Sequence, residues 1–108
     1  MKASEALAAR IRPLLAGRAV AETRIIGGTG FMLDGNLAVG TTSKGDLLVR
    51  IDPAREATAL ARPGAYVMQM GKTPMKGYVA VAAAGLSDEA LAGWLEDALA
   101  FTRTLPPK

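Results

Sequence analysis

The chain has 108 residues, a length that favours one domain with a single core of moderate size. It contains no cysteine and no histidine, which excludes disulfides, thiolate metal sites and the side chain that most often acts as a general base near neutral pH. Its formal net charge of +3, from 13 basic and 10 acidic residues spread along the chain, indicates only a mild attraction to anions.

The first predicted element is an amphipathic helix over residues 4–16. Its large apolar residues recur at helical spacing and form one stripe, Leu7, Ile11, Leu14 and Leu15. Ser4 is expected to cap the N-terminus, and Pro13 predicts a bend or an early end near Arg12. We expect the stripe to pack on a sheet, and a dimer interface is the alternative.

Four short strands are predicted next. Residues 20–26 alternate between the two faces of a strand and run into Gly27, Gly28, Thr29 and Gly30, where the backbone is free to turn or bulge. Three apolar runs follow, separated by turn-forming residues 34–36 and 43–46, at residues 31–33, 37–42 and 47–51. Short apolar runs alternating with tight turns are typical of an antiparallel meander.

Beyond residue 51 the pattern predicts a short helix and two more strands. Asp52 and Pro53 suit the N-cap and the first position of a helix over residues 54–62. The next stretch divides into a strand, a loop and an apolar strand central to the sheet, at residues 66–70, 71–77 and 78–83.

A last helix is predicted to open at Ser87 and to end near Arg103. Ser87 precedes two acidic residues, which complement the helix dipole in the first turn. The resulting order is α-β-β-β-β-α-β-β-α, with about six antiparallel strands. Strands joined by hairpins, with helices set apart from them, indicate an α+β fold in a single domain over residues 1–108.

The chain has no apolar run long enough to cross a bilayer, and residues 1–5 lack the apolar core of a signal peptide. We therefore expect a cytoplasmic, soluble protein with no membrane partner.

Two stretches imitate nucleotide-binding motifs but lack their context. The triplet at residues 71–73 ends like a phosphate-binding P-loop, yet Tyr66 stands where the motif needs glycine and Pro74 interrupts the required helix. The glycine-rich stretch at residues 27–30 precedes a predicted strand, so no helix N-terminus would face a phosphate. We predict no catalytic residues, no cofactor and no metal.

The best candidate for an interaction site is the predicted loop that ends at Tyr78. It carries two lysines, a methionine and an aromatic residue between two strands, where a loop can reach a partner. The candidate residues are Lys72, Thr73, Pro74, Met75, Lys76 and Tyr78. The alternative is a connecting loop with Met75 against the core. Tyr66, Met68 and Met70 are either core or a soft recognition surface.

Together these motifs resemble the N-terminal domain of the TfoX/Sxy family. The matching positions are Gly27 to Phe31, Leu33 to Ala38, Leu48 to Arg50, Pro63-Gly64, Pro74 to Val79, Trp94 and Leu105 to Lys108. The resemblance implies an α+β fold similar to that of secretion-chaperone-like proteins, and by analogy a homodimer. The family is associated in some bacteria with regulating natural competence. Its competence regulators carry a further C-terminal helical domain, so this chain resembles the stand-alone, single-domain branch.

The leading hypothesis is a non-enzymatic regulatory or protein-interaction module with an unidentified protein partner. The alternative is weak nucleic-acid binding, which requires dispersed basic residues to share one face, namely Arg10, Arg18, Arg24, Arg50, Lys72 and Lys76. An enzyme acting on a small anionic ligand is the third hypothesis. A closed pocket lined by a buried lysine or carboxylate would favour it.

Overall fold

The computed structural model describes residues 2–108 and confirms the α+β fold with the predicted order of elements. The helices are α1 Ala3–Leu15, α2 Glu56–Leu60 and α3 Asp88–Thr102, and the 3-10 helix η1 is Pro53–Arg55. The strands are β1 Ala21–Ile25, β2 Gly28–Leu33, β3 Asn36–Thr41, β4 Leu47–Arg50, β5 Ala65–Met70 and β6 Thr73–Val81. Within this part of the chain, every helix is too short or too polar to span a membrane.

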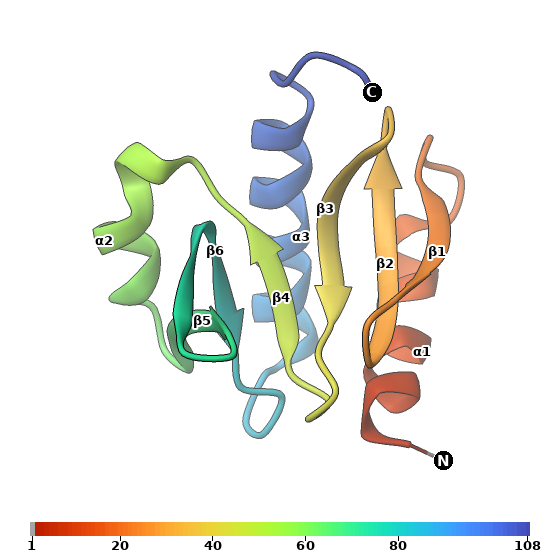
Figure 1. Cartoon of the computed structure of the whole chain (residues 1–108). Coiled ribbons are helices and arrows are strands. Elements are labelled where there is room, and N and C mark those ends of the chain that lie inside the picture. Colours follow the sequence, from red (N-terminus) through yellow and green to blue (C-terminus); the bar gives the residue numbers. More distant parts are fainter. Residues whose placement is uncertain (1) are drawn as a thin grey trace.

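The six strands form one antiparallel sheet in the order β1-β2-β3-β4-β6-β5 (Figure 1). β4 and β6 are neighbours although α2 and β5 lie between them in the sequence. The apolar strand predicted over residues 78–83 is an internal strand, because β6 pairs with β4 on one side and with β5 on the other, but it lies next to an edge and not at the centre of the sheet. β1 and β5 are the two edges of the sheet.

The three helices cover one face of the sheet. α1 packs on β2 and β3, α3 packs on β3 and β4, and α2 packs on β6 and β5. Ala59 of α2 belongs to the same buried cluster as the apolar residues of α1 and α3, so the helices share a face. Figure 1 looks at the sheet with α1 and α3 behind it.

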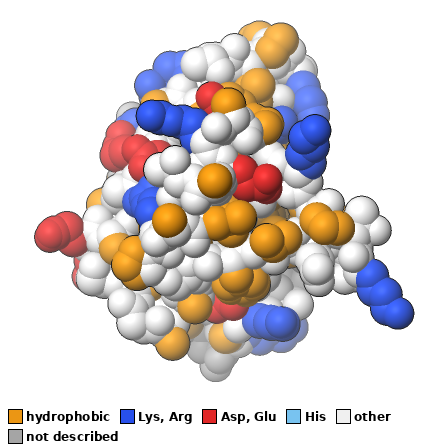
Figure 2. All heavy atoms as spheres, turned by 90° about the vertical axis from the view of Figure 1, so that its left-hand side faces the viewer, with side chains coloured by type: hydrophobic (Ala, Val, Ile, Leu, Met, Phe, Trp, Pro, Cys, Tyr) orange, Lys and Arg blue, Asp and Glu red, His pale blue; other side chains and the backbone are white. Residues whose placement is uncertain are grey.

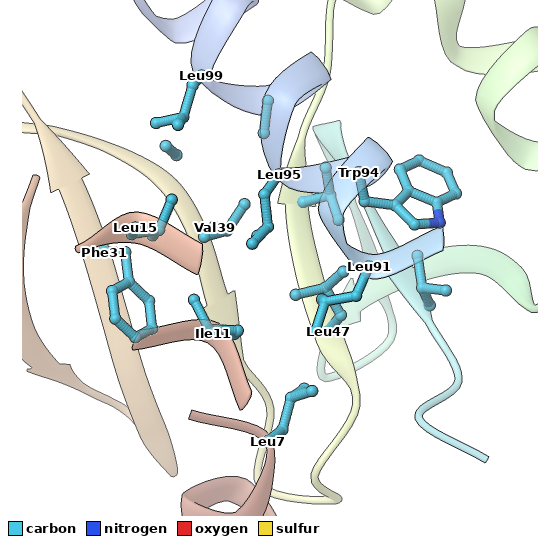
Figure 3. Close-up of a cluster of buried hydrophobic side chains, with 14 of the residues drawn as sticks. Leu7, Ile11, Leu15, Phe31, Val39, Leu47, Leu91, Trp94, Leu95 and Leu99 are labelled. Atoms are coloured by element: carbon cyan, nitrogen blue, oxygen red, sulfur yellow. The ribbon is translucent and has the colours of Figure 1, made fainter. Parts of the chain in front are cut away.

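The core lies between this helical layer and the sheet (Figure 3). Successive strand residues point to opposite faces, so alternate residues enter the core. Val39, Val49 and Val79 are partners across β3, β4 and β6, and none is more than 1% exposed. They meet the apolar stripes of α1 and α3, of which Ile11 and Leu91 are fully buried.

Turn-forming and capping residues predicted the positions of several elements correctly. Asp34 and Gly35 both have positive φ, 53° and 81°, as a two-residue hairpin turn of type I′ requires. The Asp52 carboxylate accepts a hydrogen bond from the Ala54 N–H at 3.0 Å, and Ser87 Oγ likewise caps α3. These side chains confirm the predicted starts of η1 and α3.

The glycine-rich stretch does not form the predicted turn throughout. The turn is at residues 26 and 27, and β2 begins at Gly28. Glycine is needed here because neighbouring groups come close: a Cβ on Gly28 would lie 2.2 Å from the Thr41 carbonyl oxygen. The glycines therefore allow close packing of β2 against β3.

For α1, the predicted cap at Ser4 and the predicted early end near Arg12 are wrong. Ser4 lies inside the helix and is buried, while Lys2 occupies the N-cap position without a side-chain hydrogen bond. The helix also continues through Pro13 to Leu15. Pro13 falls in the last turn, so it removes only one hydrogen bond near the helix end, and burial of Leu15 holds that turn on the core.

The predicted helix over residues 54–62 is shorter than expected. η1 occupies Pro53–Arg55, and the α-helical part is limited to Glu56–Leu60. Ala59 is the buried residue of this segment, so little apolar contact extends the helix further.

Candidate interaction surface

The predicted interaction loop is the end of a β-hairpin. β6 begins at Thr73, and Met70 pairs with Thr73, so only Gly71 and Lys72 connect β5 and β6. Gly71 has a φ of 62°, which suits the first position of a two-residue hairpin turn. The prediction of a loop over residues 71–77 is therefore wrong.

Pro74 is tolerated in this strand because of its position. It pairs with Gln69 of β5, whereas β4 pairs with β6 only from Tyr78 to Val81. The missing N–H of Pro74 therefore breaks no hydrogen bond to β4, as expected of proline where a strand lies at the sheet border. Sequence reasoning took this proline as a loop signal because it could not know that β4 ends there.

The hairpin is irregular near its middle. Val67 pairs with Val79, but Gln69 pairs with Pro74, so one residue of β5 faces four residues of β6. Gly77, within this bulge, has a φ of 84°, and its carbonyl accepts a hydrogen bond from the Ile51 N–H at 2.9 Å. The bulge therefore ends the regular pairing with β4, and only β5 pairs with the outer part of β6.

β5 exposes large apolar side chains along an open edge. Tyr66, Val67 and Met70 are 36%, 44% and 58% exposed. Within residues 2–108, the other exposed large hydrophobic residues are Leu14, at 38%, and Ile26, at 90%. Figure 2, viewed from the side of α2 and this hairpin, shows hydrophobic side chains near the middle of the face, with both basic and acidic side chains around them. An open edge with apolar side chains is a surface on which another strand can pair.

A hollow of about 430 Å³ lies beside β5, between this strand and the β3–β4 turn. Its lining includes Thr42, Ser43 and Lys44 from the turn and Tyr66 and Val67 from β5. The hollow therefore adds a concave surface next to Tyr66 and Val67.

Tyr66 joins the beginning of β5 to the β3–β4 connection through a hydrogen bond. Its hydroxyl donates a hydrogen bond to the Asp46 carboxylate, whose other oxygen accepts the Ala83 N–H at 3.0 Å. Burial and the neighbouring carboxylate together raise the pKa of Tyr66 to about 12. The neutral phenol is therefore held in place as a structural hydrogen-bond donor.

The candidate residues from the sequence lie along one hairpin but differ in exposure. Lys72, Thr73, Pro74 and Lys76 are exposed, and Met75 is half-buried. Tyr78 is also half-buried, and the Arg50 guanidinium carbon lies 5.3 Å from its ring centroid.

Sequence reasoning missed Val67. Valine is typical of buried strands, so its residue type gives no sign of exposure. Only the order of the strands in the folded sheet places it on an edge. Met70 was left between core and recognition surface, and its exposure excludes the core.

The basic residues of the nucleic-acid hypothesis do not gather on one face. Arg24 lies on β1 and Lys72 lies on the β5–β6 hairpin, at opposite edges of the sheet. Arg10 pairs with Asp88 of α3 at 2.9 Å, on the helical side. This distribution divides the positive charge among separate surfaces.

Comparison with known proteins supports the resemblance seen in the motifs. The TfoX N-terminal domain family matches residues 14–102 of the 108-residue chain, a span that includes all six strands, α2 and α3. No curated protein and no solved structure matches the chain. From the extent of the family match, the chain belongs to the TfoX N-terminal domain family.

Proposed function

We propose that this chain is a non-enzymatic regulatory module that binds a partner protein along β5. The observation that carries the proposal is the exposure of Tyr66, Val67 and Met70 on an edge strand. A partner segment in extended conformation would pair with the free backbone groups of β5. Its apolar side chains would cover those of the edge strand.

Charge at the hairpin end supports a preference among partner segments. Lys72 lies in the turn and Lys76 lies on the bulged part of β6, and both are exposed. Lysines on an edge also discourage indiscriminate pairing of strands. A segment with alternating apolar residues and an acidic residue near the hairpin end would fit best, because it would match both features.

The chemistry of the hydroxyl group at this surface supports a binding role. Tyr66 is the residue here whose pKa departs clearly from its ordinary value, and the departure is upward. A raised pKa makes the phenolate rarer near neutral pH, so Tyr66 is poorly suited to act as a base or nucleophile.

The test is affinity capture from the native cell with the whole chain as bait. Val67→Lys and Met70→Lys place a charge on the open edge of β5, and we expect each to lose the partner. Ile26→Lys is the matched control, because Ile26 is 90% exposed and lies next to β1, at the opposite edge.

Thermal unfolding of each variant checks that the fold is intact. Retention of every captured protein by both β5 variants would refute the proposal, and so would equal loss with Ile26→Lys. Sedimentation of the purified chain tests for a homodimer: if Met70→Lys converts a dimer to a monomer, the segment that pairs with β5 comes from a second copy of the chain.

A further inference from the structure

The segment after α3 folds back onto the turn between β2 and β3. Arg103 caps α3, and residues 104–108 cross from the helical layer to the end of the β2–β3 hairpin (Figure 1). Leu105 is half-buried, and residues 106–108 are exposed, so this last part buries little of its own surface. Its attachment to the fold therefore depends on specific contacts with the turn.

Two backbone groups of the segment form hydrogen bonds with the turn. The Pro106 carbonyl accepts a hydrogen bond from the Asn36 carboxamide at 2.9 Å, and the Lys108 N–H donates to the Asp34 carbonyl at 2.8 Å. Pro107 lies between them, and its fixed φ favours the extended conformation before the segment binds. The turn therefore recognises the backbone of an extended segment through one donor and one acceptor.

The turn is shaped to receive this segment. Gly35 has a φ of 81°, and a Cβ there would lie 2.8 Å from the Lys108 carbonyl oxygen and 3.0 Å from the Lys108 Cβ. The missing side chain therefore leaves the space that Lys108 occupies. Asn36 is 2% exposed with the segment in place, and the Pro106 carbonyl is the acceptor for its carboxamide. A buried donor that loses its acceptor costs free energy, which favours the closed position.

We propose that residues 106–108 are a strap that closes on the β2–β3 turn and opens while the rest of the fold stays intact. Two neutral hydrogen bonds hold the strap, whereas the sheet and the helices share one apolar core. Local opening of such a segment needs less free energy than global unfolding. While closed, the strap occupies the hydrogen-bonding groups of the turn and excludes any other extended segment from them. The inference does not depend on the proposed binding of a partner at β5.

Hydrogen exchange of the Asn36 carboxamide, followed by NMR on the whole chain, reports opening of the strap directly. The reference is the set of backbone amides of β4, because this strand is paired on both sides. We expect the carboxamide to be protected at least about a hundredfold less than the β4 amides, each relative to its own intrinsic rate. Equal protection would mean that the strap opens only when the whole chain unfolds, and it would overturn the proposal.

Two variants of Lys108 test the recognition of the backbone. Lys108→Pro removes the N–H that donates to Asp34. It should speed exchange of the Asn36 carboxamide about fivefold, the factor that corresponds to one hydrogen bond of about 1 kcal/mol. Lys108→Ala is the matched control, because it keeps the N–H and should leave the exchange rate unchanged. Equal rates in these two variants would overturn the proposal.

Two glycine variants test the shape of the turn. Gly35→Ala places a methyl group against Lys108 and should speed carboxamide exchange at least about fivefold, because the strap can no longer close fully. Gly71→Ala is the matched control: Gly71 also has a positive φ in a hairpin turn, 62°, but a Cβ there would meet nothing within 4 Å. The β4 amides show in each variant whether the stability of the whole fold has changed. Equal acceleration in both glycine variants, or none in Gly35→Ala, would overturn the proposal.

Discussion

Individual glycines in this chain have opposite structural roles. Gly28 lies where a Cβ would come 2.2 Å from the Thr41 carbonyl oxygen, so β2 and β3 could not keep their separation. Gly93 lies within α3, where a Cβ would meet only the end of the Arg62 side chain at 3.7 Å, an ordinary contact distance. The same residue type is therefore required at one position and replaceable at the other.

We predict opposite effects of alanine at these two positions. Gly28→Ala should lower the free energy of unfolding by about 3 kcal/mol, because backbone must shift to relieve the contact. Gly93→Ala should raise it by about 0.5–1 kcal/mol, because alanine loses less backbone entropy in a helix. Denaturant unfolding of both variants measures the difference, and a destabilised Gly93→Ala or a neutral Gly28→Ala would contradict the packing described.

Tyr66 predicts a change in stability at alkaline pH. Its folded-state pKa of about 12 lies above the ordinary value of 10.0, so folding favours the protonated phenol. The resulting stabilisation is fully present below pH 10 and is lost as the pH rises through 12.

Tyr66→Phe should lower the unfolding free energy by about 0.5–1 kcal/mol near neutral pH. This is a small contribution for a hydrogen bond, because the Tyr66 side chain is partly exposed. The difference between the two proteins should shrink from pH 10 upward, since the wild type then loses the same hydrogen bond. Unfolding titrations at a series of pH values give this difference directly. A difference that is constant from pH 8 to 12 would mean that the Asp46 hydrogen bond does not stabilise the fold.

The helical elements are tied to one another and to the sheet by ion pairs at their margins. Arg12 of α1 bonds Glu5 of the same helix and Glu22 of β1, and Arg18 bonds Glu96 of α3 at 2.8 Å. The hydrogen bond from Arg18 holds the pKa of Glu96 below its ordinary value of 4.5. Such exposed pairs position elements and add little to stability.

Because the pKa of Glu96 is lowered on folding, its stabilising effect is present above about pH 4.5 and is lost as the pH falls further. We therefore expect Glu96→Gln to be slightly less stable than the wild type at pH 7, with the two proteins converging in acid. Added salt at pH 7 should also reduce the difference. Thermal unfolding of the variant and the wild type, at pH 7 and in acid, measures this difference in stability. A difference that persists in acid would mean that packing of Glu96, and not its charge, is the cause.

Local chemistry explains which elements could be predicted from the sequence. The turn at Asp34 and Gly35 and the cap at Ser87 depend only on adjacent residues, and both were correctly placed. Continuation of α1 through Pro13 depends on burial of Leu15 against the core, which residue patterns do not reveal. The start of β6 at Thr73 depends on where β4 ends, so Pro74 was misread as a loop residue.

At the scale of the whole molecule, the strand order determines where a partner segment could pair with the sheet. β5 is the last strand in that order, so its outer edge pairs with no other strand among residues 2–108.

The sequence indicated only part of the β5 surface. Lys72 and Lys76 could be identified from the sequence because they lie close together between two strand-like apolar runs. Exposure of Val67 follows from the strand order, in which β5 is last.

The central claim is that a partner protein pairs with the open edge of β5. Amide hydrogen exchange on the chain, alone and in the complex purified by affinity capture, tests it most directly. Pairing would give hydrogen-bond partners to those N–H groups of β5 that point away from β6, so we expect their exchange to slow markedly in the complex while exchange in β1 is unchanged. Unchanged exchange throughout β5, with protection confined to other elements, would contradict the account.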